Sequence, residues 1–368
     1  MKNWSIPAGR LFGVELRIHA TFALLLIFLL ATESVRSGPR GGVRALLLVV
    51  IIFGSVVLHE LGHAVTAMNF GVGVRSIILL PIGGITLMDD EARNMPNPRR
   101  DIRIALAGPV VNLVLAVFFG TGVLLFLPKV NLWTQPWVSS ASLLRSLVWT
   151  NFFLGAFNLL PAYPMDGGRV LRAWLSYRME YLQATRRAVV IGQLFAIGLL
   201  MLGLGIGDFW LPLIAVFLFF GAQIEDRSAV FQAVLEQVHM EDVMLTDFKT
   251  LSPADTLEDA LHKVVHSLQD DFPVVRGGDM VGTISRQRIM ETLRIQGNGY
   301  VQGAMNRFFQ IAQRKETLAS VFRRVGQTGL SIVPVVDGEH LVGIVTLQNL
   351  MHSIAALAEA RKLRQPEA

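Results

Sequence analysis

Three side chains in the segment H-E-L-G-H have the types and spacing to use a divalent metal ion: His59, Glu60 and His63. If this segment is helical, the two imidazoles lie four residues apart on one face and can bind one zinc ion together. The carboxylate between them then borders the metal-bound water molecule. The pattern therefore predicts a metal centre for hydrolysis, near the end of the apolar run Val43–Met68.

A third metal ligand must come from elsewhere, because a catalytic zinc site normally has three protein ligands and a water molecule. The best candidate is Asp166 in N-L-L-P-A-Y-P-M-D-G-G-R, residues 158–169, where a carboxylate lies among apolar residues. An isolated charge there would be costly, and a metal ion would compensate it. An ion pair with Arg169 or Arg172 would also compensate it, so the sequence leaves both explanations open.

A second histidine pair has the same spacing but a different context. His262 and His266 occur in H-K-V-V-H, without a glutamate after the first histidine and within the pattern of a soluble helix. We expect an ordinary exposed helix face there.

The composition separates two parts of the chain. With 52% hydrophobic and 17% charged residues, and a mean hydropathy of +0.49, the chain is too apolar for an ordinary soluble protein. We expect a membrane core over 1–224, a linker helix over 225–240, a soluble domain over 241–356 and a tail over 357–368. The sequence has no cysteine, which excludes disulfides and thiolate ligands.

The membrane core is expected to be a multi-span α-helical protein. Apolar segments of near-membrane length occur at 18–32, 43–68, 102–127, 144–160, 188–206 and 209–223. Six spans is the simplest count, and we expect the first segment to be retained as a span, although a signal peptide is the alternative.

Basic residues predict how this core is oriented. With the N-terminus inside, thirteen Lys and Arg residues in the short flanks lie inside and five outside, which favours cytoplasmic N- and C-termini. The arginines lie at the ends of apolar runs and form no continuous stripe, so the net charge of +5 indicates a lipid bilayer as partner and not nucleic acid.

Two segments of the core have sequences that predict β-hairpins. Val74–Met88 is rich in β-branched residues and is broken by Pro81 and Gly83, which favours a membrane-embedded β-hairpin over a helix. An ordinary cytoplasmic loop is the alternative. Ser5–His19 alternates apolar and polar residues around Gly13, as a short interfacial hairpin does.

H-E-L-G-H together with N-x-x-P-x-x-P-M-D-G resembles the site-2 protease family of intramembrane zinc metalloproteases, in particular its bacterial branch with a C-terminal CBS pair. The resemblance covers essentially the whole chain. It implies that His59, His63 and Asp166 bind Zn²⁺, that Glu60 is the general acid and base, and that Asn158 helps to position substrate. It also implies a membrane-anchored protein as substrate and a bacterial inner or plasma membrane as location.

A further segment shares the family's pattern. Gly108-Pro109-x-x-Asn112 resembles its third-helix motif.

The soluble domain contains an internal repeat, seen in D-F-P-V-V with M-V-G-T-I-S and in S-I-V-P-V-V with L-V-G-I-V-T. The two copies resemble a pair of CBS motifs in one Bateman module, which implies adenine-nucleotide binding. Many family members have an acidic residue where this chain has Arg288, after Ser285, and Asn349, after Thr346. A structural role, or homodimer formation through the CBS pair, is therefore equally open.

Two other functions fit parts of this pattern. A CBS-regulated transporter or channel would also join an apolar core to a CBS pair, but the core shows no repeated halves. A zinc-binding scaffold without activity is the other alternative, and the presence of Glu60 argues against it.

Overall fold

The structure is a computed structural model that describes residues 4–81, 83–88, 97–267, 269–326, 332–338 and 340–346. It divides into two compact units, Met1–Ala229 and Val230–Ala368. The helix α7, Trp210–Gln237, is continuous from the last predicted span into the predicted linker. The domain boundaries read from the sequence stay predictions, and the predicted tail at 357–368 lies outside the described residues.

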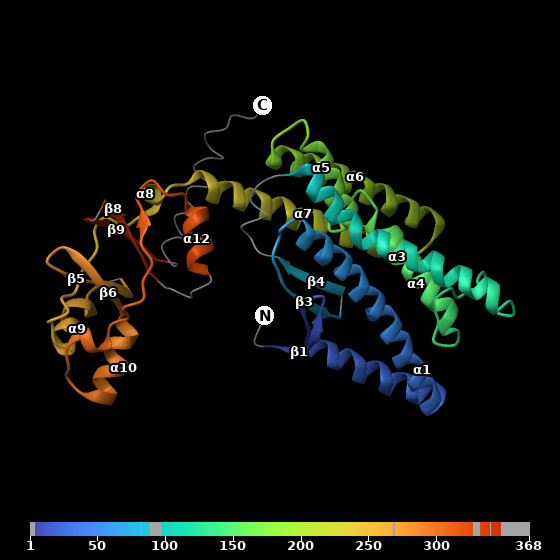
Figure 1. Ribbon diagram of the computed structural model, residues 1–368, viewed down its shortest axis with the longest axis horizontal. Coiled ribbons are helices and arrows are strands. Elements are labelled where there is room, and N and C mark those ends of the chain that lie inside the picture. Colours follow the sequence, from blue (N-terminus) through green and yellow to red (C-terminus); the bar gives the residue numbers. More distant parts are fainter. Residues whose placement is uncertain are drawn as a thin grey trace. The chain divides into compact units, whose positions relative to one another are not determined.

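Helix α1, Ala20–Asn69, consists of two arms that meet at Gly38, where φ is 72°. The rings of Phe22 and Phe53 lie 4.5 Å apart, whereas a single straight helix would separate these residues by roughly 46 Å at about 1.5 Å per residue. The chain therefore reverses within α1, as the two blue arms in Figure 1 show. These arms hold the first two predicted apolar segments.

The remaining helices of the first unit follow the other predicted segments. They are α3 Pro98–Phe126, α4 Leu143–Asn158, α5 Asp166–Leu175, α6 Tyr181–Ile206 and α7. Among the described residues, α1, α3 and α6 are long and apolar enough to cross a membrane. Large apolar side chains such as Phe118 and Leu194 are 68% and 63% exposed, as expected for helices that face lipid. The chain is thus a membrane protein with three candidate spans.

Both predicted hairpins are present, and they join into one four-stranded sheet. The strands are β1 Ser5–Leu11, β2 Val14–His19, β3 Val74–Leu80 and β4 Gly83–Met88, in that order. Each hairpin is antiparallel, and β2 pairs with β3 in parallel, Leu16 opposite Ile77. Val14 and Ile77 pack against Leu61 and Ala64 of α1, so the sheet rests on the arm that carries the H-E-L-G-H segment.

The second unit repeats one pattern twice at a constant offset. The first copy contains α8 Met240–Val243, α9 Leu257–Val265, β5 Asp271–Arg276, β6 Asp279–Ser285 and α10 Arg286–Gln296. The second contains α11 Val301–Ala304, β7 Ala312–Gln313, α12 Leu318–Gly326, β8 Ile332–Asp337 and β9 His340–Thr346. Each hairpin has its register shift at the equivalent place, between Val274 and Val275 and between Val335 and Val336.

Reciprocal β-bridges also connect the two copies. Leu245 of the first copy pairs with Ile344 of the second, and Asn306 of the second pairs with Thr283 of the first. Such reciprocal pairing means that the copies fold around each other with approximate two-fold symmetry. The predicted internal repeat is therefore confirmed, and each copy combines helices with a β-hairpin.

Candidate metal centre

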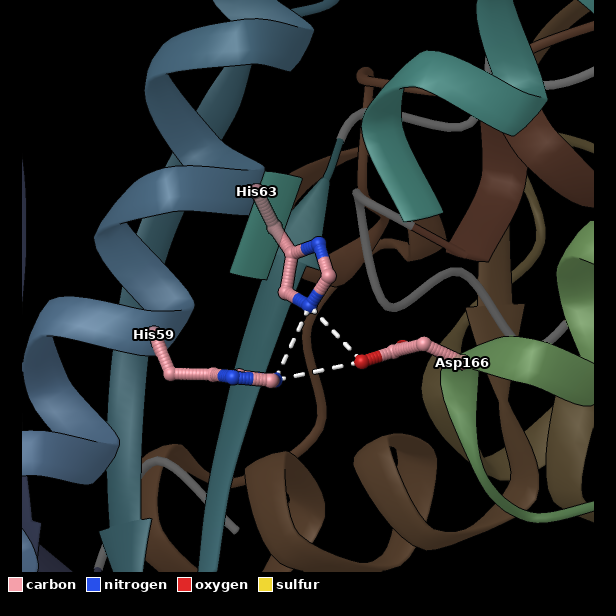
Figure 2. A group of neighbouring side chains, drawn as sticks. All are labelled: His59, His63 and Asp166. Carbon is pink, nitrogen blue, oxygen red and sulfur yellow. Dashed lines mark hydrogen bonds and ion pairs between the residues drawn. The ribbon is translucent and has the colours of Figure 1, made fainter. Parts of the chain in front are cut away.

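His59 and His63 lie one helical turn apart on the second arm of α1, where both side chains are buried. Their Nε2 atoms are 3.1 Å apart and their rings are nearly perpendicular, at 84°. The helical spacing predicted from the sequence therefore brings both imidazoles to one point (Figure 2).

Asp166 reaches the same point from a distant part of the chain. Helix α4 ends at Asn158, and Asp166 is the first residue of α5. The break contains Pro161 and Pro164, which cannot donate helical hydrogen bonds. Asp166 Oδ2 lies 3.1 Å from the Nε2 atom of His59 and 3.1 Å from that of His63.

The three ligand atoms have the arrangement that a zinc ion requires. In a tetrahedral site with ligands at about 2.0–2.2 Å, neighbouring ligand atoms lie roughly 3.3–3.6 Å apart. The three distances here are each 3.1 Å, and all three side chains are buried. Two neutral imidazoles and one carboxylate form a common ligand set for catalytic zinc, so the residues present fit the ion.

The arginines near Asp166 approach its carboxylate less closely than the two histidines do. Arg169 approaches only Oδ1, at 3.9 Å, and its side chain is half exposed. Arg172 contacts Tyr181 at 2.7 Å and Glu225 at 3.4 Å. The carboxylate therefore directs its Oδ2 atom to the histidines, and the arginines contribute little to its position.

Both imidazoles are held from behind by groups of α3. His59 Nδ1 lies 3.1 Å from Asn112 Oδ1, and His63 Nδ1 lies 2.6 Å from the carbonyl oxygen of Ile104. Partners on the second nitrogen fix the orientation of a metal-binding histidine. Gly108 leaves room for the rings, because a Cβ atom there would lie 2.4 Å from His63 Nε2. The sequence marked Gly108 and Asn112 only as part of a family pattern.

Glu60 lies next to the cluster but is held by the sheet. Its Oε2 atom accepts a hydrogen bond from Thr86 Oγ1 of β4, at 2.5 Å. Gly84 of the same strand packs against the Glu60 side chain, since a Cβ atom at Gly84 would lie 2.6 Å from Glu60 Cγ. The hairpin thus positions the carboxylate beside the metal site. Sequence reasoning did not identify Thr86, because nothing in the local pattern pairs it with Glu60.

Asn158 is near the C-terminal end of α4, and its Nδ2 atom donates to the carbonyl of Leu154 at 2.8 Å. Its predicted role in positioning substrate stays a prediction.

The second histidine pair has the expected exposed setting. His262 and His266 are exposed on and just after α9, and they belong to no group of potential metal ligands among the described residues.

Two arginines of the second unit contact groups close to them in the structure. Arg286 donates to the carbonyls of Ser267 and Gln269, and Arg288 lies 3.6 Å from Glu291. Asn349 lies outside the described residues.

Comparisons with known proteins match both parts of the chain to families. Residues 47–136 and 135–202 match Peptidase family M50, and residues 240–295 and 301–356 match the CBS domain. Zinc metalloprotease MJ0392 of Methanocaldococcus jannaschii is 30% identical over 365 residues, which cover 98% of this chain and 99% of that protein. Rip3 of Mycobacterium tuberculosis is 29% identical over 389 residues, which cover 99% of this chain and 95% of Rip3. The structure of the site-2 protease from Methanocaldococcus jannaschii matches with 36% identity and a TM-score of 0.44, over 61% of this chain and 96% of that one.

Proposed function

Since the chain belongs to the site-2 protease family, Peptidase family M50, with a C-terminal CBS pair, we propose that it cleaves membrane-anchored substrate proteins within the bilayer. The family assignment makes it a zinc metalloprotease. The proposal rests on one observation. The ligand atoms of His59, His63 and Asp166 all lie within 4.8 Å of one another, in a unit with helices long and apolar enough to cross a membrane.

In this proposal the zinc ion is held by Nε2 of His59, Nε2 of His63 and Oδ2 of Asp166. When bound, zinc supplies the Lewis-acid chemistry that makes water a nucleophile near neutral pH. Glu60 accepts the proton of the attacking water and later passes it to the departing amine. Thr86 occupies Oε2 of Glu60, so Oε1 is the oxygen assigned to this transfer.

A zinc-dependent cleavage assay tests the proposed function. We expect the protein, purified in detergent, to convert a co-expressed membrane-anchored substrate into two fragments. Removal of zinc with a chelator should abolish this conversion, because water then lacks its activating Lewis acid, and added Zn²⁺ should restore it. Cleavage that continues at the same rate after metal removal, confirmed by elemental analysis, would contradict a zinc-dependent protease.

We also propose that the core has six spans: the two arms of α1, then α3, α4, α6 and α7. The excess of Lys and Arg on one side supports cytoplasmic N- and C-termini, and we propose a bacterial inner or plasma membrane as the location. Single cysteines introduced into this cysteine-free chain can be labelled from one side of the membrane. Labelling of the two chain ends from opposite sides would contradict the six-span arrangement.

For the CBS pair we propose modulation of activity, by an adenine nucleotide or by dimer formation. Nucleotide binding is disfavoured by the occupied Arg286 and by Arg288 at the position of an acidic residue. We therefore expect titration of the full-length protein with ATP, ADP or AMP to give no saturable signal at millimolar concentration. Saturable binding would support nucleotide sensing instead. The mass of the detergent-solubilised protein, measured by light scattering, tests the dimer.

A further inference from the structure

Behind His59, buried polar side chains form a hydrogen-bonded chain through helices α3, α4 and α1. Asn112 on α3 has Oδ1 at 3.1 Å from His59 Nδ1 and Nδ2 at 3.3 Å from Asn151 Oδ1 on α4. Asn151 Nδ2 in turn lies 3.0 Å from Ser55 Oγ and 2.8 Å from the carbonyl oxygen of Leu147. Asn112 and Asn151 are both 0% exposed, so water does not compete for these hydrogen bonds.

Two main-chain carbonyls determine the direction of each donor, because a carbonyl oxygen can only accept. The carbonyl of Leu147 requires the NH₂ group of Asn151 on its side. The Ser55 hydroxyl donates its only proton to the carbonyl of Ile51, at 2.8 Å, so Ser55 Oγ must also accept from Asn151. Asn151 therefore directs its oxygen toward Asn112, and Asn112 must turn its NH₂ group to Asn151 and its oxygen to the imidazole.

The oxygen of Asn112 requires a proton on Nδ1 of His59. A neutral imidazole carries one proton, so Nε2 keeps its lone pair, and Nε2 is the atom that faces His63 and Asp166. We propose that Asn151 is a positioning residue that acts through Asn112 to hold His59 in the Nδ1-protonated tautomer. This inference rests on the proposed role of His59 as a zinc ligand.

The partner of His63 shows why His59 needs this arrangement. Nδ1 of His63 meets the carbonyl of Ile104 directly, at 2.6 Å, and a carbonyl cannot reverse its role. Asn112 is different, because rotation of its amide by 180° would exchange acceptor and donor. A reversed Asn112 would favour the Nε2-protonated tautomer of His59, which cannot bind zinc through Nε2. Asn151 prevents this reversal.

A purely structural role for these amides makes a different prediction. Polar side chains between membrane helices contribute to helix packing through hydrogen bonds. Loss of such a contact would lower thermal stability and leave the affinity of the folded protein for zinc unchanged. The proposed role lowers zinc affinity in protein that remains folded.

The first test compares Asn151→Leu with Thr150→Val in the full-length protein. Thr150 is the neighbouring buried residue, and its hydroxyl has no hydrogen-bond partner among the described residues, so it is a matched control. We expect zinc affinity, measured by competition with a chelator, to fall roughly 10- to 100-fold in Asn151→Leu, as for other residues behind metal ligands. Thr150→Val should keep the wild-type affinity.

The second test uses Asn112→Asp, whose carboxylate accepts from His59 with either oxygen. The orientation of residue 112 then no longer depends on Asn151, so Asn112→Asp combined with Asn151→Leu should bind zinc more tightly than Asn151→Leu alone. A purely structural role predicts that the double variant binds zinc no more tightly than Asn151→Leu alone, or less tightly. The visible spectrum of the Co²⁺-substituted variants reports whether the ligand set is restored.

The outcomes separate this inference from the proposed function. If wild-type protein binds no zinc, the zinc role of His59 is wrong, and the positioning role fails with it. If wild-type protein binds zinc and Asn151→Leu binds it equally tightly with an unchanged Co²⁺ spectrum, the positioning role alone is wrong. Should Asn151→Leu not fold, Asn112→Leu takes its place, because it removes the amide through which Asn151 acts on His59. Wild-type zinc affinity in folded Asn112→Leu would also contradict the inference.

Discussion

Replacing Glu60 with glutamine is expected to lower peptide cleavage by roughly 100- to 10,000-fold, the usual contribution of a general base, while zinc stays bound. Glutamine has nearly the same shape but cannot accept the proton of the attacking water. The Thr86 hydroxyl can still donate to the glutamine oxygen, so the side chain should keep its place beside β4. Cleavage of a co-expressed membrane substrate and the zinc content of the purified protein are the two measurements.

The control for this variant is Glu180→Gln, which makes the same chemical change at an exposed position at the start of α6. It should cleave at the wild-type rate. A Glu60→Gln protein that cleaves as fast as wild type would reject Glu60 as the base. Loss of zinc together with activity would instead show that Glu60 supports metal binding.

Replacing Asp166 with alanine is expected to reduce zinc affinity by more than the ~10- to 100-fold typical of residues behind the ligands. The carboxylate is the only anionic group among the three ligand side chains, so its removal takes away both a ligand atom and the charge that balances the ion. Zinc content after dialysis against a weak chelator is the measurement, and cleavage should be lost in parallel.

Arg169→Gln distinguishes the metal site from an ion pair. Because Arg169 lies 3.9 Å from Asp166 Oδ1, this substitution removes the competing salt bridge and leaves the ligand triangle in place. We expect Arg169→Gln to retain zinc. Full zinc occupancy in Asp166→Ala would support the salt bridge as the reason for the buried carboxylate and would remove Asp166 from the ligand set.

The metal site was predictable because each of its ligands is indicated by the sequence immediately around it. Helical spacing brings His59 and His63 together whatever surrounds them, and the proline-containing break before Asp166 marks a buried carboxylate that needs a partner. Both hairpins were also predictable, since alternating apolar and polar residues and a glycine at the turn are properties of a short segment. The repeat in the CBS pair was visible in the same way.

The supporting contacts were not predictable, because they join segments that are distant in the sequence. Nothing near residue 86 shows that its hydroxyl meets Glu60, and β2 and β3 pair in parallel across more than fifty residues. In the sequence Asn151 is one polar residue within an apolar helix. Its role becomes visible only in the structure, where it contacts Asn112 of α3 and Ser55 of α1.

We propose that one zinc ion is bound between helix α1 and the start of α5. Anomalous scattering from crystals of the zinc-loaded protein, recorded on both sides of the zinc absorption edge, tests it most directly. We predict one strong peak within bonding distance of His59 Nε2, His63 Nε2 and Asp166 Oδ2. A peak bound to the histidines with Asp166 directed away from it, or no peak between these residues, would contradict this zinc site.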